Sequence, residues 1–228
     1  MNPPLPITPE EDPVQVVDEW LKEATQKGIQ RHPNSMTLAT VNTSGQPSAR
    51  VVLLKDLSVN KGFGVFYTHY GSKKGIDISS NSTVSAVMHW DQLGKQVRLE
   101  GEAVRSPAKE SNEYFMTRPW HSQLNAWVSE QSKSLANPID LVRRAQDKAR
   151  DLKLPDPTDI AFNELDLNKS CIPRPPFWGG YRLWFAAIEL WTEGAGRFHN
   201  RIRYERTLSP IDAYTFQASD WKSGYLQP

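Results

Sequence analysis

Positively charged side chains occur at several places in the sequence where a phosphate could be bound, and the first is residues 50–55. This segment reads Arg-Val-Val-Leu-Leu-Lys, with four apolar residues between Arg50 and Lys55. In a strand the apolar middle would be buried, and charged ends buried with it would require an anionic partner. Side-chain alternation would place Arg50 and Lys55 on opposite faces, where they would bind different groups. The alternative is a strand whose charged ends extend into water.

A second cluster, Gly71-Ser72-Lys73-Lys74, lies at the beginning of an expected helix. Unpaired backbone N–H groups, the positive end of the helix dipole and two ammonium groups would converge there, which favours a phosphate. A capped helix with surface lysines has the same pattern, so both interpretations stay open.

Residues 197–201, Arg-Phe-His-Asn-Arg, form a third cluster. On an extended segment Arg197, His199 and Arg201 would point to the same side. Arginine can stack on an aromatic ring or bind an acid, and histidine can exchange a proton near neutral pH. The pattern therefore predicts a site for an anion or a flat ring, with a solvent-exposed edge strand as the alternative.

A fourth group consists of Tyr114, Arg118 and Ser122, which recur every four residues. They would share one face of a helix that continued through all three positions. Two hydroxyls and a guanidinium are suitable donors for another phosphate. Alternatively, Tyr114 packs against the core and Arg118 faces water.

Other chemistries have little support. His32, His69, His89 and His121 have no metal-ligand spacing with one another or with Cys171, so we expect no metal site. The sequence contains no Gly-x-Gly-x-x-Gly run, Walker loop or Gly-x-Ser-x-Gly motif, which argues against classical nucleotide-binding folds and hydrolases.

The overall composition limits the class of protein. The 228 residues include 27 Lys plus Arg against 26 Asp plus Glu, so no global charge would hold the chain on nucleic acid or an anionic membrane. We expect a single domain of residues 1–228, with residues 1–11 flexible. One cysteine, Cys171, argues for a reducing compartment, and the N-terminus shows neither a signal peptide nor a membrane span. We therefore expect a cytoplasmic protein.

Hydrophobic spacing predicts an α+β fold in which antiparallel strands form a barrel or sandwich. A first helix would begin after the cap Asp12 and end before Gly28. Strands are predicted at residues 36–41, 48–54, 63–67, 84–90, 96–104, 181–191 and 201–206. Further helices are predicted at residues 72–81, at 107–118 behind Ser106, and at 138–152 behind Asn137. Residues 153–177 are rich in proline and are expected to form a long connection.

Together these segments resemble the pyridoxamine 5'-phosphate oxidase family, whose members are FMN-dependent split-barrel proteins. The resemblance extends from about Asp12 to the C-terminus, and the order and spacing of the motifs agree throughout. Its longest motifs are Gly-Gln-Pro-Ser-Ala-Arg-Val-Val-Leu-Leu-Lys at residues 45–55 and Ala-Trp-Val-Ser-Glu-Gln-Ser at residues 126–132. The other stretches that carry it are residues 66–68, 71–74, 96–98, 114–118, 178–180 and 197–201.

The resemblance implies an antiparallel split β-barrel with flanking helices, and a homodimer with FMN at the interface. The residues of one chain that would hold FMN are Arg50, Val51, Val52, Leu53, Leu54, Lys55, Tyr67, Thr68, Lys73, Lys74 and Gln96. The partner chain would add Gln131, Ser132, Trp191 and Arg201.

The substrate that the resemblance implies is a small phosphorylated pyridine compound. Its phosphate would be held by Lys55, Tyr114, Arg118 and Ser122, and its ring would be covered by Arg197 and His199. Arg197 and His199 are also the candidate catalytic residues, which would align the substrate and stabilise charge as hydride leaves for FMN. The implied reaction converts pyridoxamine or pyridoxine 5'-phosphate to pyridoxal 5'-phosphate, with O2 as electron acceptor and H2O2 as product.

Four features depart from the family pattern. Lys73 replaces an arginine, Asn200 replaces an aspartate, an Arg-x-x-Tyr stretch is missing near the N-terminus, and residues 155–170 and 208–218 suggest surface insertions. They leave two alternatives. One is a related split-barrel oxidase of the phenazine-pathway type that acts on another aromatic compound, and the other is a non-catalytic protein that binds FMN or pyridoxal phosphate.

Overall fold

The structure, a computed structural model, describes residues 8–158 and 172–228. Its contacts divide the chain into two compact units. The barrel unit comprises Met1–Tyr67, Asp77–Arg105 and Tyr181–Pro228, and the helical unit comprises Thr68–Ile76 and Ser106–Gly180. Cys171 and most of the segment 155–170 lie outside the described residues, so the predictions made for them are not tested.

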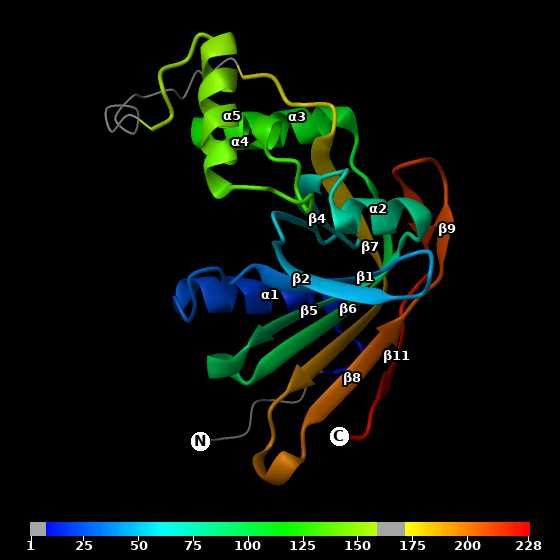
Figure 1. The fold of residues 1–228 in the computed structure, drawn as a ribbon. Helices are drawn as coiled ribbons and strands as arrows, with labels where there is room; N and C mark the ends of the chain where they lie inside the picture. Colours follow the sequence, from blue (N-terminus) through cyan, green and yellow to red (C-terminus); the bar gives the residue numbers. More distant parts are fainter. Residues whose placement is uncertain (1–7, 159–171) are drawn as a thin grey trace. The chain divides into compact units, whose positions relative to one another are not determined.

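The barrel unit is built on one antiparallel sheet (Figure 1). Seven strands follow the order β11-β8-β7-β6-β5-β1-β2, and β4 pairs with both β3 and β7, so that the sheet curls into a split barrel. β9 and β10 form a small separate sheet. The strands are β1 Ser35–Val41, β2 Pro47–Leu53, β3 Asp56–Ser58, β4 Phe63–His69, β5 Thr83–Trp90, β6 Lys95–Arg105, β7 Trp178–Thr192, β8 Asn200–Glu205, β9 Leu208–Pro210, β10 Phe216–Ala218 and β11 Lys222–Tyr225.

Alternation along the strands gives this sheet two different faces. The inner face carries the core, and one cross-strand row of it, with every member fully buried, consists of Leu38, Ala86, Leu99, Ile188 and Tyr204. The neighbouring row points to the opposite side, here called the outer face, and consists of Thr37, Val87, Arg98, Glu189 and Arg203. The outer face is therefore polar where the inner face is apolar.

Local sequence signals explain the first elements of the barrel unit. The side chain of Asp12 accepts a hydrogen bond from the N–H of Val14 at 2.8 Å, so the predicted cap of α1 Pro13–Gln26 is confirmed. The strands predicted at residues 36–41 and 48–54 are also confirmed, as β1 and β2, which pair antiparallel in a hairpin. In its turn, Asn42 Oδ1 accepts from two backbone N–H groups, and Gly45 has a φ of 82°, which favours glycine.

The helical unit holds α3 Ala108–Met116, α4 Trp120–Val128, α5 Pro138–Asp151 and the beginning of α2 Lys73–Ser80. Asn137 caps α5 as predicted, through a hydrogen bond from the N–H of Ile139. The predicted cap Ser106 is wrong, because Pro107 occupies the cap position and the Ser106 hydroxyl donates to Glu110 instead. No helix in the described parts of the chain has the length and apolar character needed to cross a membrane.

The helix predicted over residues 107–118 is confirmed as α3, but it does not continue through Ser122. α3 ends at Met116, and a second helix that was not predicted, α4, begins at Trp120. The cause is Pro119, because a proline disfavours helical geometry in the residue before it. Tyr114 therefore lies on α3, Arg118 in the link and Ser122 on α4, so these three residues do not share one continuous helix face.

Two differences concern the C-terminal part of the barrel unit. Residues 197–199 are not extended as predicted, since they follow the short turn η3 Ala195–Arg197, in which Gly196 and Arg197 have φ values of 61° and 67°. β8 begins at Asn200, one residue before the strand predicted at residues 201–206. The segment 208–218, expected to be a surface insertion, forms the β9–β10 pair.

Candidate functional site

Three of the predicted cofactor residues stand in one row on the outer face of the sheet. Gln96 of β6 is opposite Trp191 of β7, and Trp191 is opposite Arg201 of β8. Opposite residues in an antiparallel pair point to the same face. The row, called the outer-face row below, therefore places an amide, an indole and a guanidinium side by side. The family resemblance implied Gln96 from one chain and Trp191 and Arg201 from its partner; the register shows that all three stand side by side in each chain.

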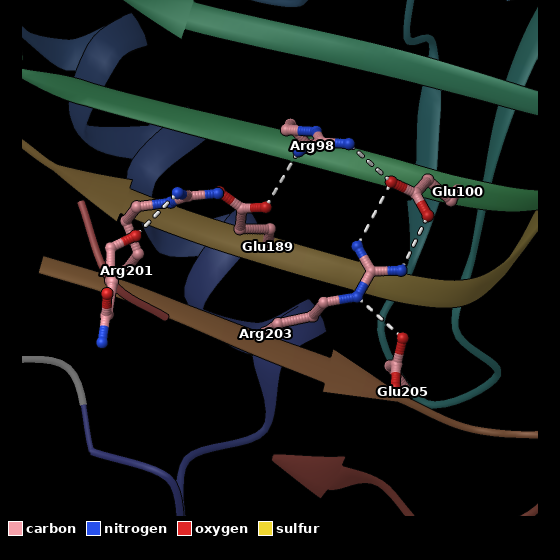
Figure 2. A network of polar contacts seen from close by, with 7 residues as sticks. Arg98, Glu100, Glu189, Arg201, Arg203 and Glu205 are labelled. Carbon is pink, nitrogen blue, oxygen red and sulfur yellow. Dashed lines mark hydrogen bonds and ion pairs between the residues drawn. The ribbon is translucent and has the colours of Figure 1, made fainter. Parts of the chain in front are cut away.

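Glu189, a carboxylate that was not predicted as a site residue, holds Arg201 of this row (Figure 2). Glu189, with 2% of its side chain exposed, accepts hydrogen bonds from Arg201 Nε at 2.9 Å and from Arg98 Nη1 at 3.1 Å. Glu189 stands two residues before Trp191 on β7, so strand alternation alone predicts that it shares a face with the row. The sequence does not show which arginines reach it.

The network continues along the outer face through Glu100 (Figure 2). Glu100 accepts from Arg98 Nη2 at 2.9 Å and from Arg203 at 3.2 and 2.8 Å, and Arg203 also contacts Glu205. The pKa of Glu100 lies below its usual value mainly because Glu100 accepts hydrogen bonds from Arg203. The same bonds raise the pKa of Arg203.

His199 lies against the outer-face row, and Arg197 lies in the exposed turn before it. The ring of His199 is 4.6 Å from that of Trp191, centroid to centroid, and its Nδ1 accepts a hydrogen bond from the N–H of Gly194 at 3.2 Å. In a neutral ring the proton is then on Nε2. The structure thus brings His199 together with the predicted cofactor residues, while Arg197 and the 80% exposed Phe198 form the tip of the hairpin.

Arg50 points to the inner face, at the edge strand β2. Its Nη1 donates to Thr40 Oγ1 at 2.7 Å and to the carbonyl of Leu38 at 3.2 Å, and its Nη2 donates to Ser48 Oγ. Both hydroxyls donate in turn to Asp77 Oδ2, at 2.7 and 3.3 Å, and Asp77 is 3% exposed. Two hydroxyls therefore link the guanidinium to a buried carboxylate that the sequence analysis missed.

These contacts leave part of Arg50 for a ligand. Nε has no hydrogen-bond partner within residues 8–158 and 172–228. Burial lowers the pKa of Arg50, and the charge of Asp77 opposes that change. A guanidinium with a fixed orientation and an unused N–H is a suitable donor for a phosphate oxygen.

The rest of the segment 50–55 differs from the prediction. Its apolar middle was expected to be buried, which is wrong for Val51, with 65% of the residue exposed, and right for Leu54, with 3%. Val52 and Leu53 are half-buried. Because β2 ends at Leu53, strand alternation does not relate Arg50 to Lys55, whose side chain is exposed.

The two lysines of the predicted cluster at residues 71–74 differ in burial. Lys73 is exposed, whereas Lys74 is 6% exposed and its ammonium group donates to Thr68, Ser72 and Gln131 at 3.0, 3.2 and 3.3 Å. Gln131 also accepts from the Thr68 hydroxyl at 2.9 Å. The family resemblance implied that Gln131 contributes to the partner's FMN site; within its own chain its side chain lies beside Lys74.

Arg118 lies in the link between α3 and α4 and packs against aromatic rings. Its guanidinium carbon is 4.4 Å from the ring centroid of Trp178 and 5.7 Å from that of Phe115. Burial lowers its pKa, and the nearby Tyr114 opposes that change. Nη1 is fully buried and has no hydrogen-bond partner in the described part of the chain.

Gln123 and Trp178 hold this arginine in place, although neither was predicted as a site residue. The Gln123 amide, in a residue that is 2% exposed, donates to the backbone carbonyls of Arg118 and Phe115 at 2.9 and 3.2 Å. Trp178 stacks nearly parallel to Tyr114, with centroids 6.3 Å apart and planes at 8°. Residues 117–119, which link α3 to α4 without regular secondary structure, are thus held by contacts with Gln123 and Trp178.

The predicted site residues belong to both units of the chain. The barrel unit supplies Arg50, Lys55, Tyr67, Gln96, Trp191, Arg197, His199 and Arg201. The helical unit supplies Thr68, Lys73, Lys74, Tyr114, Arg118, Ser122, Gln131 and Ser132. Among these, Ser132 has a φ of 73° in an exposed turn.

Comparison with known proteins identifies the family. Residues 21–152 match the family model described as Pyridoxamine 5'-phosphate oxidase. The chain belongs to the pyridoxamine 5'-phosphate oxidase family. Residues 178–228 match the model described as Pyridoxine 5'-phosphate oxidase C-terminal dimerisation region. The predicted family is therefore confirmed, and with it an FMN-dependent enzyme that forms a homodimer.

Individual relatives agree with this assignment. The chain is 39% identical to the pyridoxine/pyridoxamine 5'-phosphate oxidase of Rubrobacter xylanophilus over 217 residues, which are 95% of the chain and 87% of that protein. It is also 39% identical to the Haemophilus influenzae protein of the same name over 196 residues, 86% of the chain and 84% of the relative.

Solved structures confirm the predicted split-barrel fold. The crystal structure of PhzG from Burkholderia lata, in complex with tetrahydrophenazine-1-carboxylic acid, has a TM-score of 0.78 and 27% identity, and the match covers 96% of the chain and 94% of PhzG. A pyridoxamine 5'-phosphate oxidase-related, FMN binding protein from Nostoc punctiforme has a TM-score of 0.67 at 14% identity, which supports the fold alone.

The residues present fit FMN. Arg50 offers an N–H that the described residues do not use, as a phosphate requires. The outer-face row offers an indole and two groups of N–H donors, which suit a flat heteroaromatic ring with carbonyl and ring-nitrogen acceptors.

Proposed function

We propose that the chain oxidises pyridoxamine 5'-phosphate or pyridoxine 5'-phosphate to pyridoxal 5'-phosphate, with O2 as electron acceptor and H2O2 as product. The observation that carries the proposal is Arg118 Nη1, a buried donor with no partner in the described residues. Such a donor costs about 1–3 kcal/mol, and native proteins rarely keep one without a reason. A phosphate ester would supply the missing acceptor.

The surroundings of Arg118 support a phosphate and not a second buried carboxylate of the protein. The face of its guanidinium is covered by Trp178, so an anion has to approach along the edge, where N–H groups bind two oxygens at once. Tyr114 lies close enough to influence the pKa of Arg118. We assign the substrate phosphate to Arg118 and Tyr114, together with Ser122 and Lys55 from the sequence prediction.

We further propose that each FMN site combines the inner side of one chain with the outer face of its partner. Arg50 and the outer-face row point to opposite faces of one sheet, and residues 178–228, the dimerisation region, include Trp191 and Arg201. A second chain can bring its row to the Arg50 side of the first. One chain would then provide Arg50, Val51, Val52, Leu53, Leu54, Tyr67, Thr68, Lys73, Lys74, Gln131 and Ser132, and its partner Gln96, Trp191 and Arg201.

In this site FMN supplies a hydride acceptor, and the chain supplies binding and orientation. His199 would donate from Nε2, because its Nδ1 is held as an acceptor by the N–H of Gly194. Arg197, in the exposed turn beside it, would cover the pyridine ring and stabilise charge as the substrate carbon is oxidised. In this proposal both residues align the substrate, and neither forms a covalent bond with it.

An aerobic assay tests the proposal directly. The purified protein should bind one FMN per chain and, with pyridoxamine 5'-phosphate, should form pyridoxal phosphate and H2O2 in equal amounts. Unphosphorylated pyridoxamine should be oxidised far less efficiently, because it lacks the group that Arg118 binds. Absence of aldehyde and peroxide from the FMN-loaded protein would refute the proposed reaction.

A second candidate function is favoured by the similarity to PhzG, whose crystal structure contains tetrahydrophenazine-1-carboxylic acid. In that case the chain would oxidise a reduced tricyclic carboxylic acid, and Arg118 would bind a carboxylate. The same peroxide assay with that compound separates the two functions. Faster turnover of the carboxylic acid than of pyridoxamine 5'-phosphate would favour the second.

A further inference from the structure

We propose that Glu189 is a positioning residue for FMN: it fixes the guanidinium of Arg201 on the outer-face row, and removing its carboxylate weakens cofactor binding. This inference rests on the proposed function, because it takes Arg201 as a contact of FMN. It adds a residue that touches neither cofactor nor substrate and acts through its neighbour.

Burial shows that the pairing of Glu189 is not incidental. Its side chain is 2% exposed, and a buried carboxylate is tolerated only when it is paired and hydrogen-bonded. Oε1 receives Nε and Nη2 of Arg201 at 2.9 and 2.8 Å, and Oε2 receives Nη1 of Arg98 at 3.1 Å. Both oxygens are therefore engaged, and Arg201 is held by one side of its guanidinium.

A third contact completes the fixation of Arg201. Its Nη1 donates to the backbone carbonyl of Gln227 at 2.9 Å, so all three nitrogens of the guanidinium have a partner. A guanidinium has five N–H groups. One hydrogen on Nη1 and one on Nη2 are not used by these contacts, and they are the donors that Arg201 can offer to a ligand. Their direction is set by Glu189.

Glu100 provides a matched control within the same network. Like Glu189, it lies on the outer face and is held by two arginines, Arg98 and Arg203, but it does not contact Arg201 (Figure 2). If the network only joined the strands, loss of either carboxylate would have similar consequences. If Glu189 positions Arg201, only the loss of Glu189 changes the geometry of the outer-face row.

The sign of the effect separates positioning from simple electrostatics. FMN carries a phosphate dianion, so removing a negative charge from the chain would strengthen its binding if long-range attraction dominated. Loss of the fixed geometry acts in the opposite direction, because Arg201 would have to be ordered when the cofactor binds. Weaker binding in Glu189→Gln therefore indicates positioning.

The experiment measures FMN affinity of the apoprotein by quenching of flavin fluorescence. We expect the Kd to rise about tenfold in Glu189→Gln, the equivalent of losing one hydrogen bond from a charged donor, and less than about twofold in Glu100→Gln. In an Arg201→Met background, Glu189→Gln should cause no further loss, because it acts through that arginine. An unchanged or lower Kd in Glu189→Gln, an equal loss in Glu100→Gln, or additive losses in the double variant would each overturn the proposal.

Glu189→Asp covers the case in which the glutamine variant does not fold. It keeps the buried charge but withdraws the carboxylate by one carbon, so its Kd should also rise, and a wild-type Kd would overturn the proposal. A wild-type protein that does not bind FMN would refute the proposed function as well. Normal binding by wild type and by both Glu189 variants would refute this inference alone.

Discussion

Replacing Arg118 by methionine should affect substrate binding strongly and folding stability little. Methionine has a similar length and can fill the space over Trp178, but it carries no donor. The structure predicts this separation because Arg118 has an aromatic partner for its face and none within residues 8–158 and 172–228 for Nη1.

The magnitudes follow from these two contacts. Removing the unsatisfied donor should add about 1–3 kcal/mol to the free energy of unfolding, and losing the cation–π contact should remove about 0.5–2 kcal/mol. The two changes oppose each other, so the net change in the free energy of unfolding should lie between about −1 and +2.5 kcal/mol. A phosphate bound by even one charged hydrogen bond of Arg118 gains about 1.5–3 kcal/mol, so the KM for the phosphorylated substrate should rise about tenfold to a hundredfold.

Steady-state kinetics with phosphorylated and unphosphorylated pyridoxamine, together with urea unfolding, test this prediction. Lys109→Met is a matched control, since it removes one positive charge from α3 at a side chain that is 88% exposed. It should change neither KM nor stability appreciably. The reasoning is refuted if Arg118→Met leaves the KM for the phosphorylated substrate unchanged, raises both KM values equally, or destabilises the fold by several kcal/mol.

Three further predictions concern other parts of the site. Arg197→Met should keep FMN bound but lose most turnover, because Arg197 lies in an exposed turn and supports no core contact; unchanged kinetics would exclude it from the substrate site. Thr40→Val should lower the free energy of urea unfolding by about 1–3 kcal/mol and weaken FMN binding, because the buried Thr40 hydroxyl links Arg50 to Asp77. Thr37→Val, at an exposed position of the same strand, should change neither the stability nor FMN binding. Because the pKa of Glu100 is lowered on folding from its ordinary value of 4.5, its contribution to stability is present above that pH and is lost as the pH falls further. Unfolding measured below pH 4.5 should therefore show a smaller loss of stability in Glu100→Gln than in wild type, and identical slopes would contradict the assignment.

The elements that could be predicted from the sequence are those specified by neighbouring residues. Asp12 and Asn137 cap their helices because a side-chain oxygen reaches an N–H two residues ahead. Asn42 and Gly45 determine the first hairpin turn in the same way. The family motifs then extended these local predictions to a fold.

The helix predicted over residues 107–118 ends directly before Pro119, but this break was not applied to the group Tyr114, Arg118 and Ser122. Four-residue spacing suggested a common face for Tyr114, Arg118 and Ser122, yet a residue before proline is disfavoured in helical geometry. That signal alone would have placed Arg118 in a link between helices. The error matters because the unusual environment of Arg118 depends on its lying outside a helix.

The long-range partners of the arginines could not be predicted from the sequence. Glu189 is separated from Arg98 by 91 residues, and Thr40 is separated from Asp77 by 37. These pairs depend on strand register and on the path of the sheet, and no local pattern specifies them. Sequence therefore indicated which cations matter but not how each one is neutralised.

The way in which each arginine is neutralised distinguishes the two proposed phosphate sites from the proposed site for the flavin ring. Arg201 is paired directly with the buried Glu189, and Arg50 is linked to Asp77 only through two hydroxyls. Arg118 contacts no carboxylate in the described part of the chain. A phosphate dianion is bound best by a cation whose charge is not already compensated, so the proposed function assigns the phosphates to Arg118 and Arg50. A compensated guanidinium such as Arg201 still donates hydrogen bonds with a fixed direction, which is what an uncharged ring system requires. The chain has 27 basic and 26 acidic residues, so its net charge gives no sign of this difference. The difference is seen only in the contacts of each guanidinium.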